Sequence, residues 1–223
     1  LSASSELMTS IKESLVAARN GTIGANDRAI LVEELRGKME ELRGVANRQG
    51  PNGDFLMAGT QRDNTPFPAG GTGDFLGLTP ANQSQVKGRA IEVANGRTVD
   101  LSVTGFDAYV NPNTGESVFQ TLDAAITALQ DPTYPGAGGA LSTQVGTRMD
   151  ELDDTFNQLQ LARTKVGVRL REVDTSTSIN ESAKFELERV AGDAIGLDYA
   201  KAISDLSQGQ LQLQASQQSF AST

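Results

Sequence analysis

The densest group of side chains that could do chemistry is a run of four carboxylates, Asp150, Glu151, Asp153 and Asp154. Such a cluster binds Ca²⁺ when a loop presents its oxygens at alternating positions, as in the EF-hand. These four residues lack that spacing, and they fall in a stretch with helical periodicity, near the predicted N-terminal end of its helix. We therefore interpret them as an acidic helix face in solvent, and we expect no metal site.

A glycine-rich stretch, Gly70-Gly71-Thr72-Gly73, is the second candidate, because glycine loops can cradle phosphate groups. No Gly-Lys-Ser/Thr sequence follows it, and no helix is predicted to begin directly after the glycines. Residues 60 to 84 are instead rich in Gly, Pro, Thr, Asn and Gln, which is typical of a loop. The sequence predicts no cofactor.

The composition argues against most catalytic chemistry. The 223 residues include no Cys, no His and no Trp, which excludes thiol and imidazole nucleophiles, the usual zinc ligands and disulfides. Aromatic residues make up only 5% of the chain, and no pair of carboxylates is predicted to face across a cleft. We expect no enzyme, and a carbohydrate-binding module is a weak alternative.

The charge and hydropathy of the chain argue against nucleic-acid binding and membrane insertion. A net charge of −9 without a basic cluster argues against nucleic acid, and no run of about 18 apolar residues predicts membrane insertion. Leu1 opens the sequence without the charged segment of a signal peptide. Because the chain begins without Met inside a predicted helix, we expect terminal segments of the full protein to lie outside this sequence.

The elements that would position these residues are mostly helices. From Leu141 to Val173, apolar residues recur at alternating steps of four and three, which is typical of a helix lying along partner helices. At about 1.5 Å per residue this stretch gives a rod of about 50 Å. Two earlier segments, residues 7–18 and 31–46, have the same periodicity and are the predicted partners. We predict that Asn20-Gly21 ends the first of these helices and that Asn26 or Asp27 caps the second.

One position of the seam holds Arg163 in place of an apolar residue. It either pairs with Glu34 or Glu41 and fixes the register, or it extends its charged end into solvent. The sequence leaves both alternatives open.

Between residues 86 and 110 the hydrophobic period changes to two, with Asn95-Gly96 as a hairpin turn and residues 106–110 as a further strand. An amphipathic helix over 119–129 would cover this sheet. The predicted fold class is α+β, an elongated antiparallel helical bundle from both chain ends with an inserted small β-rich domain. The expected divisions are 1–62, the N-terminal part of the helical core; 63–135, the inserted outer domain; and 136–223, the C-terminal part leading into a terminal assembly helix.

The C-terminal segment has a thin apolar stripe. Gly192 to Gly196 is predicted to break the long helix, and Asp198 is predicted to cap a final one. Leu206, Leu213 and Phe220 recur every seven residues on a polar, Gln-rich background. So little apolar surface suits a helix that neighbouring copies complete, which makes these three residues candidates for partner contacts.

The run after the second helix is the other candidate for partner contacts. Phe55 to Ala58 is predicted as a strand or hairpin arm between two glycine turns. It either caps the bundle or docks against a neighbouring subunit, because an apolar tip suits both roles. The candidate residues are Asn52, Gly53, Phe55, Leu56, Ala58 and Gly59.

Several of these stretches resemble one family. "NRQGPNGDFLMAGT" (47–60) is similar to the Asn-Gly-x-aromatic-Leu-x-Ala-Gly loop of the hook-filament junction proteins, the hook-associated protein 3 family of flagellin relatives. "VFQTLDAAITAL" (118–129), "RTKVGVRLREVD" (163–174) and "DYAKAISDLSQGQLQLQASQQSF" (198–220) fit the same family. The resemblance spans most of the chain and is weakest over residues 60–117. A flagellin-type filament subunit is the alternative.

The resemblance implies a structural adaptor of the bacterial flagellum that joins the hook-associated ring to the flagellin filament. The implied partners are other copies in a homo-oligomeric ring, hook-associated protein 1, flagellin, the flagellar type III export apparatus and an export chaperone. It also implies an extracellular location in the flagellum, reached by type III export without a cleaved signal peptide. The family fold implies a helical core from both chain ends and a β-rich outer domain.

Overall fold

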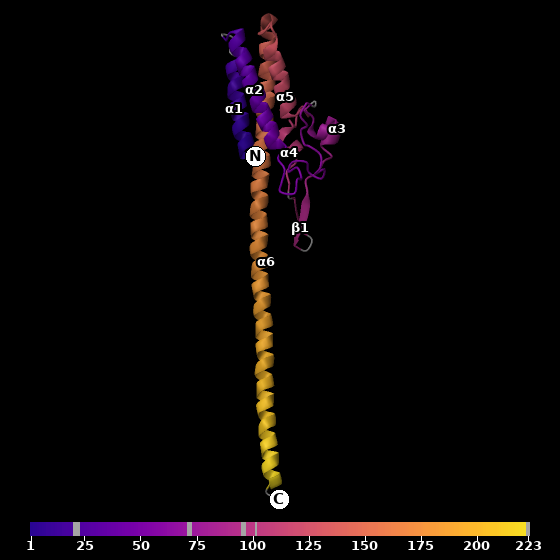
Figure 1. The fold of residues 1–223 in the computed structure, drawn as a ribbon, viewed down its shortest axis with the longest axis vertical. Helices are drawn as coiled ribbons and strands as arrows, with labels where there is room; N and C mark the ends of the chain where they lie inside the picture. The colour runs from indigo at the N-terminus through magenta and orange to yellow at the C-terminus, as the bar shows by residue number, and fades with distance from the viewer. Residues whose placement is uncertain (20–22, 71–72, 95–96, 101, 222–223) are drawn as a thin grey trace. The chain divides into compact units, whose positions relative to one another are not determined.

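The computed structural model describes residues 1–19, 23–70, 73–94, 97–100 and 102–221. The chain divides into two compact units, Leu1–Arg171 and Glu172–Thr223. The first unit contains the helices α1 (Ser2–Arg19), α2 (Ala25–Ala46) and α5 (Val118–Gln130), and the helix α6 (Ala140–Ala221) belongs to both (Figure 1). Helices therefore account for most of the described backbone.

A local sequence signal explains where α5 begins, whereas the start predicted for α2 is not observed. Ser117 and Gln120 form a capping box at α5, in which each side chain accepts a hydrogen bond from the other residue's backbone N–H. The N-cap of α2 is Gly24, so the predicted cap at Asn26 or Asp27 is wrong. The predicted stop of α1 at Asn20-Gly21 lies outside the described residues.

One apolar core holds the helices of the first unit together. Val145, Leu152 and Leu159 of the seam predicted over 141–173 are buried with side chains from α1, α2 and α5, and Met149, Phe156 and Val166 are partly buried. Leu170 of that seam is 60% exposed, so burial does not extend to its end. Burying each such side chain stabilises the fold by about 1.5–3 kcal/mol relative to exposing it. The core residues of these four helices that are at most 1% exposed include Met8, Ile11, Leu15, Leu35, Leu42, Leu122, Ile126, Val145, Leu152 and Leu159.

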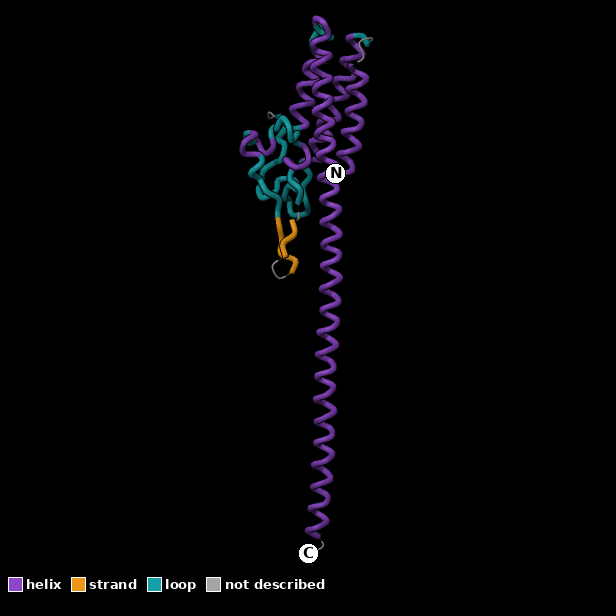
Figure 2. Tube along the Cα trace, turned by 180° about the vertical axis from the view of Figure 1, so that it is seen from behind, coloured by secondary structure: helices purple, strands orange, loops and turns teal. Residues whose placement is uncertain are grey.

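The predicted α+β fold class is wrong, because the described residues contain no inserted β-rich domain. Their strands are limited to one antiparallel hairpin, β1 (Ala90–Ala94) with β2 (Arg97–Asp100), in which Ile91 pairs with Val99 (Figure 2). The turn predicted at Asn95-Gly96 lies outside the described residues. The alternating pattern thus located a hairpin but not a sheet large enough to form a domain.

The further strand predicted at 106–110 is a helix, α4 (Gly105–Tyr109). Thr104 and Asp107 make a capping box in which each side chain accepts from the other's backbone N–H, and this starts a helical turn. The remaining short elements are η1 (Phe75–Gly77), α3 (Pro80–Gln83) and η2 (Ala137–Gly139). Loops make up most of the rest of residues 63–117 that the structure describes.

Aromatic packing stabilises these loops without a sheet. The ring centroid of Phe67 lies 5.6 Å from that of Phe75, 5.7 Å from that of Tyr109 and 4.7 Å from that of Phe119. The Tyr109 hydroxyl is 2.6 Å from the Ser4 hydroxyl, in a buried hydrogen bond across 105 residues of sequence. This cluster therefore attaches the loops to α1 and α5.

The break predicted at 192–196 is also wrong, because α6 continues through Gly192 and Gly196 to Ala221. One glycine in a helix costs about 1 kcal/mol, which is small against the backbone hydrogen bonds of an 82-residue helix. Asp198 lies within the helix and caps no new one.

Arg163 is exposed, and no ion pair to it is found among the described residues. Glu34 instead forms an ion pair with Lys38 of its own helix and accepts a hydrogen bond from the Ser14 hydroxyl. The structure therefore fits the alternative in which Arg163 extends into solvent, and it provides no carboxylate that fixes the register through this residue.

Asn47, the C-cap of α2, connects the helices to the loop that follows. Its Nδ2 donates to the Phe67 carbonyl at 2.7 Å, and its Oδ1 accepts from the Phe67 backbone N–H at 2.8 Å. Arg43 adds a bond from Nη1 to the Pro68 carbonyl at 2.9 Å and lies over the Phe119 ring. The amide of Asn47 thus satisfies both backbone groups of Phe67.

We predict that Asn47→Ala lowers the free energy of unfolding by about 1–3 kcal/mol, because two partly buried backbone groups lose their partner. Urea unfolding of the chain measures this change. Arg48→Ala, at the exposed next position, is the matched control and should change it by less than about 0.5 kcal/mol. Equal effects of the two substitutions would contradict the role given to the amide.

Candidate functional site

The loop after α2 is held by backbone hydrogen bonds on both sides. Phe55 forms an isolated antiparallel bridge with Gln49, so the predicted strand or hairpin arm is limited to this one pair. The Leu56 N–H donates to the Arg48 carbonyl at 3.0 Å, and the Gly105 N–H donates to the Met57 carbonyl at 2.7 Å. The loop is therefore fixed between the end of α2 and the start of α4.

The structure separates the predicted loop residues into two groups. Asn52 and Gly53 are exposed at the turn, Leu56 is 50% exposed and Phe55 is half-buried. Ala58 and Gly59 are buried. The first group is accessible to a partner, whereas the second holds the loop in place.

Gly59 shows why the second group is structural. Its φ is +61°, and a Cβ added there would lie 2.5 Å from the Lys87 carbonyl oxygen and 3.1 Å from Thr104 Cγ2. Only glycine fits this approach of two backbone segments without displacement. Gly59 therefore joins the loop to the segment that leads into β1.

Basic side chains surround the accessible part of the loop. The guanidinium of Arg62 lies 3.2 Å from the Asp54 carboxylate, and that of Arg89 lies 4.0 Å from it. Arg48 and Lys87 are exposed beside Leu56 and Gly59. Asp54 is paired with two arginines, so this face carries an excess of positive charge.

A shallow pocket of about 380 Å³ lies beside the loop. Phe55, Leu56 and Met57 line it from the loop, and Val103 and Val166 line it from the neighbouring segments. The loop is thus part of an apolar surface with a basic edge.

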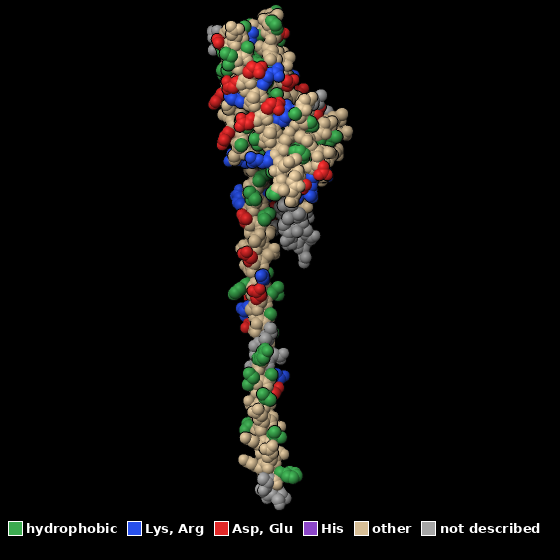
Figure 3. Space-filling view, in the orientation of Figure 1, with side chains coloured by type: hydrophobic (Ala, Val, Ile, Leu, Met, Phe, Trp, Pro, Cys, Tyr) green, Lys and Arg blue, Asp and Glu red, His purple; other side chains and the backbone are tan. Residues whose placement is uncertain are grey.

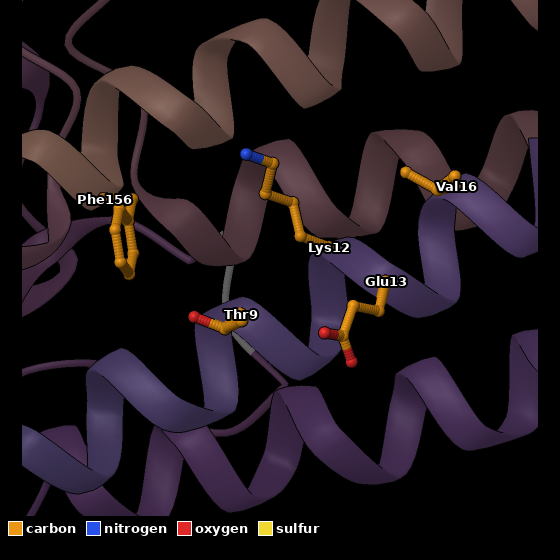
Figure 4. Close-up of a pocket in the computed structure, with 5 residues that line it drawn as sticks. All are labelled: Thr9, Lys12, Glu13, Val16 and Phe156. Atoms are coloured by element: carbon orange, nitrogen blue, oxygen red, sulfur yellow. The ribbon is translucent and has the colours of Figure 1, made fainter.

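A larger groove of about 590 Å³ lies between α1 and α6 of the first unit. Val16 of α1 and Phe156 of α6 lie at its two ends, and Lys12 extends from α1 toward α6 (Figure 4). Thr9 and Glu13 complete its lining. Sequence analysis did not select Val16 as a candidate. Its position could have indicated an accessible apolar surface, because it is an apolar residue outside the buried stripe of its helix.

One ion pair and one hydrogen bond connect the two sides of this groove. Lys12 forms a salt bridge with Asp153, and Gln160 donates to the Ser5 hydroxyl at 3.3 Å. Lys and Arg alternate with Asp and Glu over the surrounding helices (Figure 3). Asp153 is one of the four carboxylates that were expected to form an acidic helix face in solvent. The structure pairs this carboxylate with Lys12 across the groove.

Two other carboxylates of that run, Glu151 and Asp154, also contact neighbouring groups. Arg148 Nη1 lies 2.7 Å from Glu151 and 2.6 Å from Glu116, and Asn113 donates to Asp154 at 2.9 Å. The described residues contain no group of three or more metal-ligating side chains that could hold an ion. The run thus fastens the loop before α5 to α6.

Two pKa values reflect local structure. The hydrogen bond from Lys38 lowers the pKa of Glu34, with Ser14 adding a second donor. Burial raises the pKa of Tyr109, against a smaller opposing effect of its hydrogen bond with Ser4. Both groups hold helices and loops together and lie outside the groove lining.

The predicted C-terminal contact residues lie in the second unit. Leu206 is 63% exposed, Leu213 61% and Phe220 88%, and their spacing of seven places them along one side of the helix. Within Glu172–Thr223 this stripe is not buried.

A search of the described helices for a segment that could span a membrane found none.

Comparison with solved structures shows which known fold the chain has. The fold matches that of FlgL from Xanthomonas campestris, with a TM-score of 0.72 and 16% identity over 86% of this chain and 90% of that one. Hook-associated protein 3 from Legionella pneumophila matches with a TM-score of 0.69 and 13% identity, over 82% and 86% of the two chains. The chain therefore has the fold of flagellar hook-associated proteins.

The chain is also similar in sequence to flagellar hook-associated protein 3. The chain is 27% identical to flagellar hook-associated protein 3 of Escherichia coli K12 over 232 aligned residues, which cover 97% of this chain and 71% of the relative. No family model matches the chain. The resemblance to hook-associated protein 3 predicted from short motifs is confirmed over almost the whole sequence.

We predict that Gly59→Ala destabilises the chain by about 1–3 kcal/mol, because the new methyl group meets the Lys87 carbonyl in a backbone conformation that alanine disfavours. Gly53→Ala is the matched control: its φ is +83°, but nothing lies within 4 Å of the added Cβ. Thermal unfolding should give a lower melting temperature for Gly59→Ala than for Gly53→Ala. Similar melting temperatures would mean that the close approach at Gly59 does not contribute to stability.

Proposed function

We propose that this chain is a structural adaptor of the bacterial flagellum that joins the hook-associated ring to the flagellin filament. The similarity to hook-associated protein 3 along 97% of the chain carries the proposal. A structural neighbour from Legionella pneumophila is described as a flagellar junction protein. A role without catalysis agrees with a sequence that lacks Cys and His.

The adaptor would meet its neighbours through both of its units. In this proposal, copies form a homo-oligomeric ring that contacts hook-associated protein 1 on one side and flagellin on the other. Export would use the flagellar type III apparatus and a chaperone, which places the protein outside the cell. Residues 1–62 and 136–223, together with α5, would form the helical core and lead into the terminal assembly helix, and the rest of 63–135 would form an outer insertion.

The exposed stripe of the second unit supports a role in assembly. Leu206, Leu213 and Phe220 are each more than half exposed, and an apolar heptad stripe is typical of helices that pack along partners. Burial of such side chains between subunits stabilises an assembly, whereas their exposure in one chain does not. The proposal assigns these residues to contacts made only after assembly.

The direct experiment is complementation of a strain that lacks its hook-filament junction protein, using the full-length form of this protein. The proposal predicts that filaments grow, swimming returns and flagellin stays on the cell. If the protein is exported while flagellin still leaks into the medium, the adaptor role is contradicted for that flagellum. Repeating the test in a flagellin deletion separates an adaptor from a filament subunit.

We predict that Leu213→Glu reduces swimming in this complementation at least about tenfold, because a buried charge in an interface costs several kcal/mol. The circular dichroism of the purified variant should be unchanged, since Leu213 is exposed in the chain. Gln212→Glu, also exposed, is the matched control and should support normal swimming. Normal swimming with Leu213→Glu would contradict a role of this residue in assembly.

A further inference from the structure

We infer that copies of this chain associate head to tail, with the loop of residues 52–59 of one copy seated in the α1–α6 groove of a second copy. The inference rests on the proposed function, since an adaptor ring requires contacts between copies. It adds the surfaces that meet and the orientation of the contact. A contact between two different surfaces is heterologous, and such contacts form rings when the rotation closes and helices when it does not.

The groove has the properties of an acceptor. Val16, at one end, is 57% exposed although it lies on a helix whose larger aliphatic side chains are mostly buried, and Phe156, at the other end, is only partly buried. At about 590 Å³ the groove can hold more than one side chain. Covering Val16 and Phe156 would remove apolar surface from water, worth about 25 cal/mol for each Å².

The groove also carries negative charge. Lys12, the one cation in its lining, is paired with Asp153, whereas Glu13 of the lining and Glu6 one helical turn from Thr9 are exposed. No ion pair of Glu6 or Glu13 is found in the part of the chain that the structure describes. A partner surface with exposed arginine or lysine would complement these carboxylates.

The loop has the matching properties of a ligand. Leu56 is 50% exposed, with Phe55 and Met57 half-buried on either side of it in the sequence, so the loop presents an apolar surface. Arg48, Arg62 and Arg89 lie around that surface, and the carboxylate of Asp54 is already shared by Arg62 and Arg89. An apolar centre with a basic edge would meet an apolar groove with an acidic edge.

The second copy is the occupant we commit to, because the chain itself supplies both complementary surfaces. Backbone bonds at Leu56 and Met57 hold the loop in one conformation, so little ordering entropy is lost on docking. The groove walls are likewise fixed by the Lys12–Asp153 and Ser5–Gln160 contacts. Both surfaces are thus formed before they meet.

Site-directed cross-linking tests this contact, because the chain contains no Cys. Val16→Cys and Leu56→Cys proteins are mixed and treated with a short bismaleimide, and dimers are separated on denaturing gels. The inference predicts a cross-linked dimer in the mixture at least about tenfold above either protein alone. Ile30→Cys, at a 67% exposed position of α2, replaces Val16→Cys as the matched control and should give none with Leu56→Cys.

Three results of this experiment would overturn the inference. They are a Val16→Cys homodimer as the main product, which indicates like surfaces in contact; equal yields with the Ile30→Cys control; and no dimer at any concentration. Each leaves the proposed function intact if complementation succeeds, so the two failures are distinguishable.

A charge exchange gives a second and independent measurement. Glu13→Arg in the Val16→Cys protein, or Arg48→Glu in the Leu56→Cys protein, should alone reduce the cross-link yield about tenfold. Combining both substituted proteins, the double variant, should restore most of the yield. Both residues are exposed, and no ion pair of either is found among the described residues, so the variants should fold as judged by circular dichroism. Folded single variants with full yield, or a double variant as weak as the singles, would contradict the contact.

Discussion

The structure depends on burial of the apolar stripe of α6 by helices that are distant in sequence. Val145, Leu152 and Leu159 lie in the same core as Met8 and Leu35, and isolated α6 would leave these side chains in water. A hydrogen bond between Ser5 and Gln160 spans 155 residues. The first and last segments of the Leu1–Arg171 unit therefore depend on each other for the burial of their apolar side chains.

That constraint leaves distinct surfaces available for assembly. The apolar stripes of α1 and α2 are buried in the core. Apolar side chains that remain exposed include Val16, which lies outside the stripe of its helix, and Leu56, which lies on a connecting loop. Backbone contacts at Gly59 and the Phe67 cluster give the loops fixed positions without an extensive sheet. The accessible surfaces that remain are thus a few apolar and charged side chains held in fixed positions.

Sequence patterns were informative where one physical effect dominates. Helical periodicity located α1, α2, α5 and the buried part of α6, because burial of a stripe determines these elements. The patterns were misleading where local effects compete: the Thr104–Asp107 capping box made a helix of a predicted strand, and Gly192 did not break α6. In the loop, composition could not separate accessible Leu56 from structural Gly59, and the α1–α6 groove requires two helices distant in sequence.

The most direct test of the proposed role is the position of the protein in the flagellum. Isolated flagella from the complemented strain are labelled with a gold-conjugated antibody raised against the purified chain and imaged by electron microscopy. The account predicts one band of label for each flagellum, at the boundary of hook and filament. Label distributed along the filament would contradict it and indicate a filament subunit, and label absent from intact flagella would exclude a structural place there.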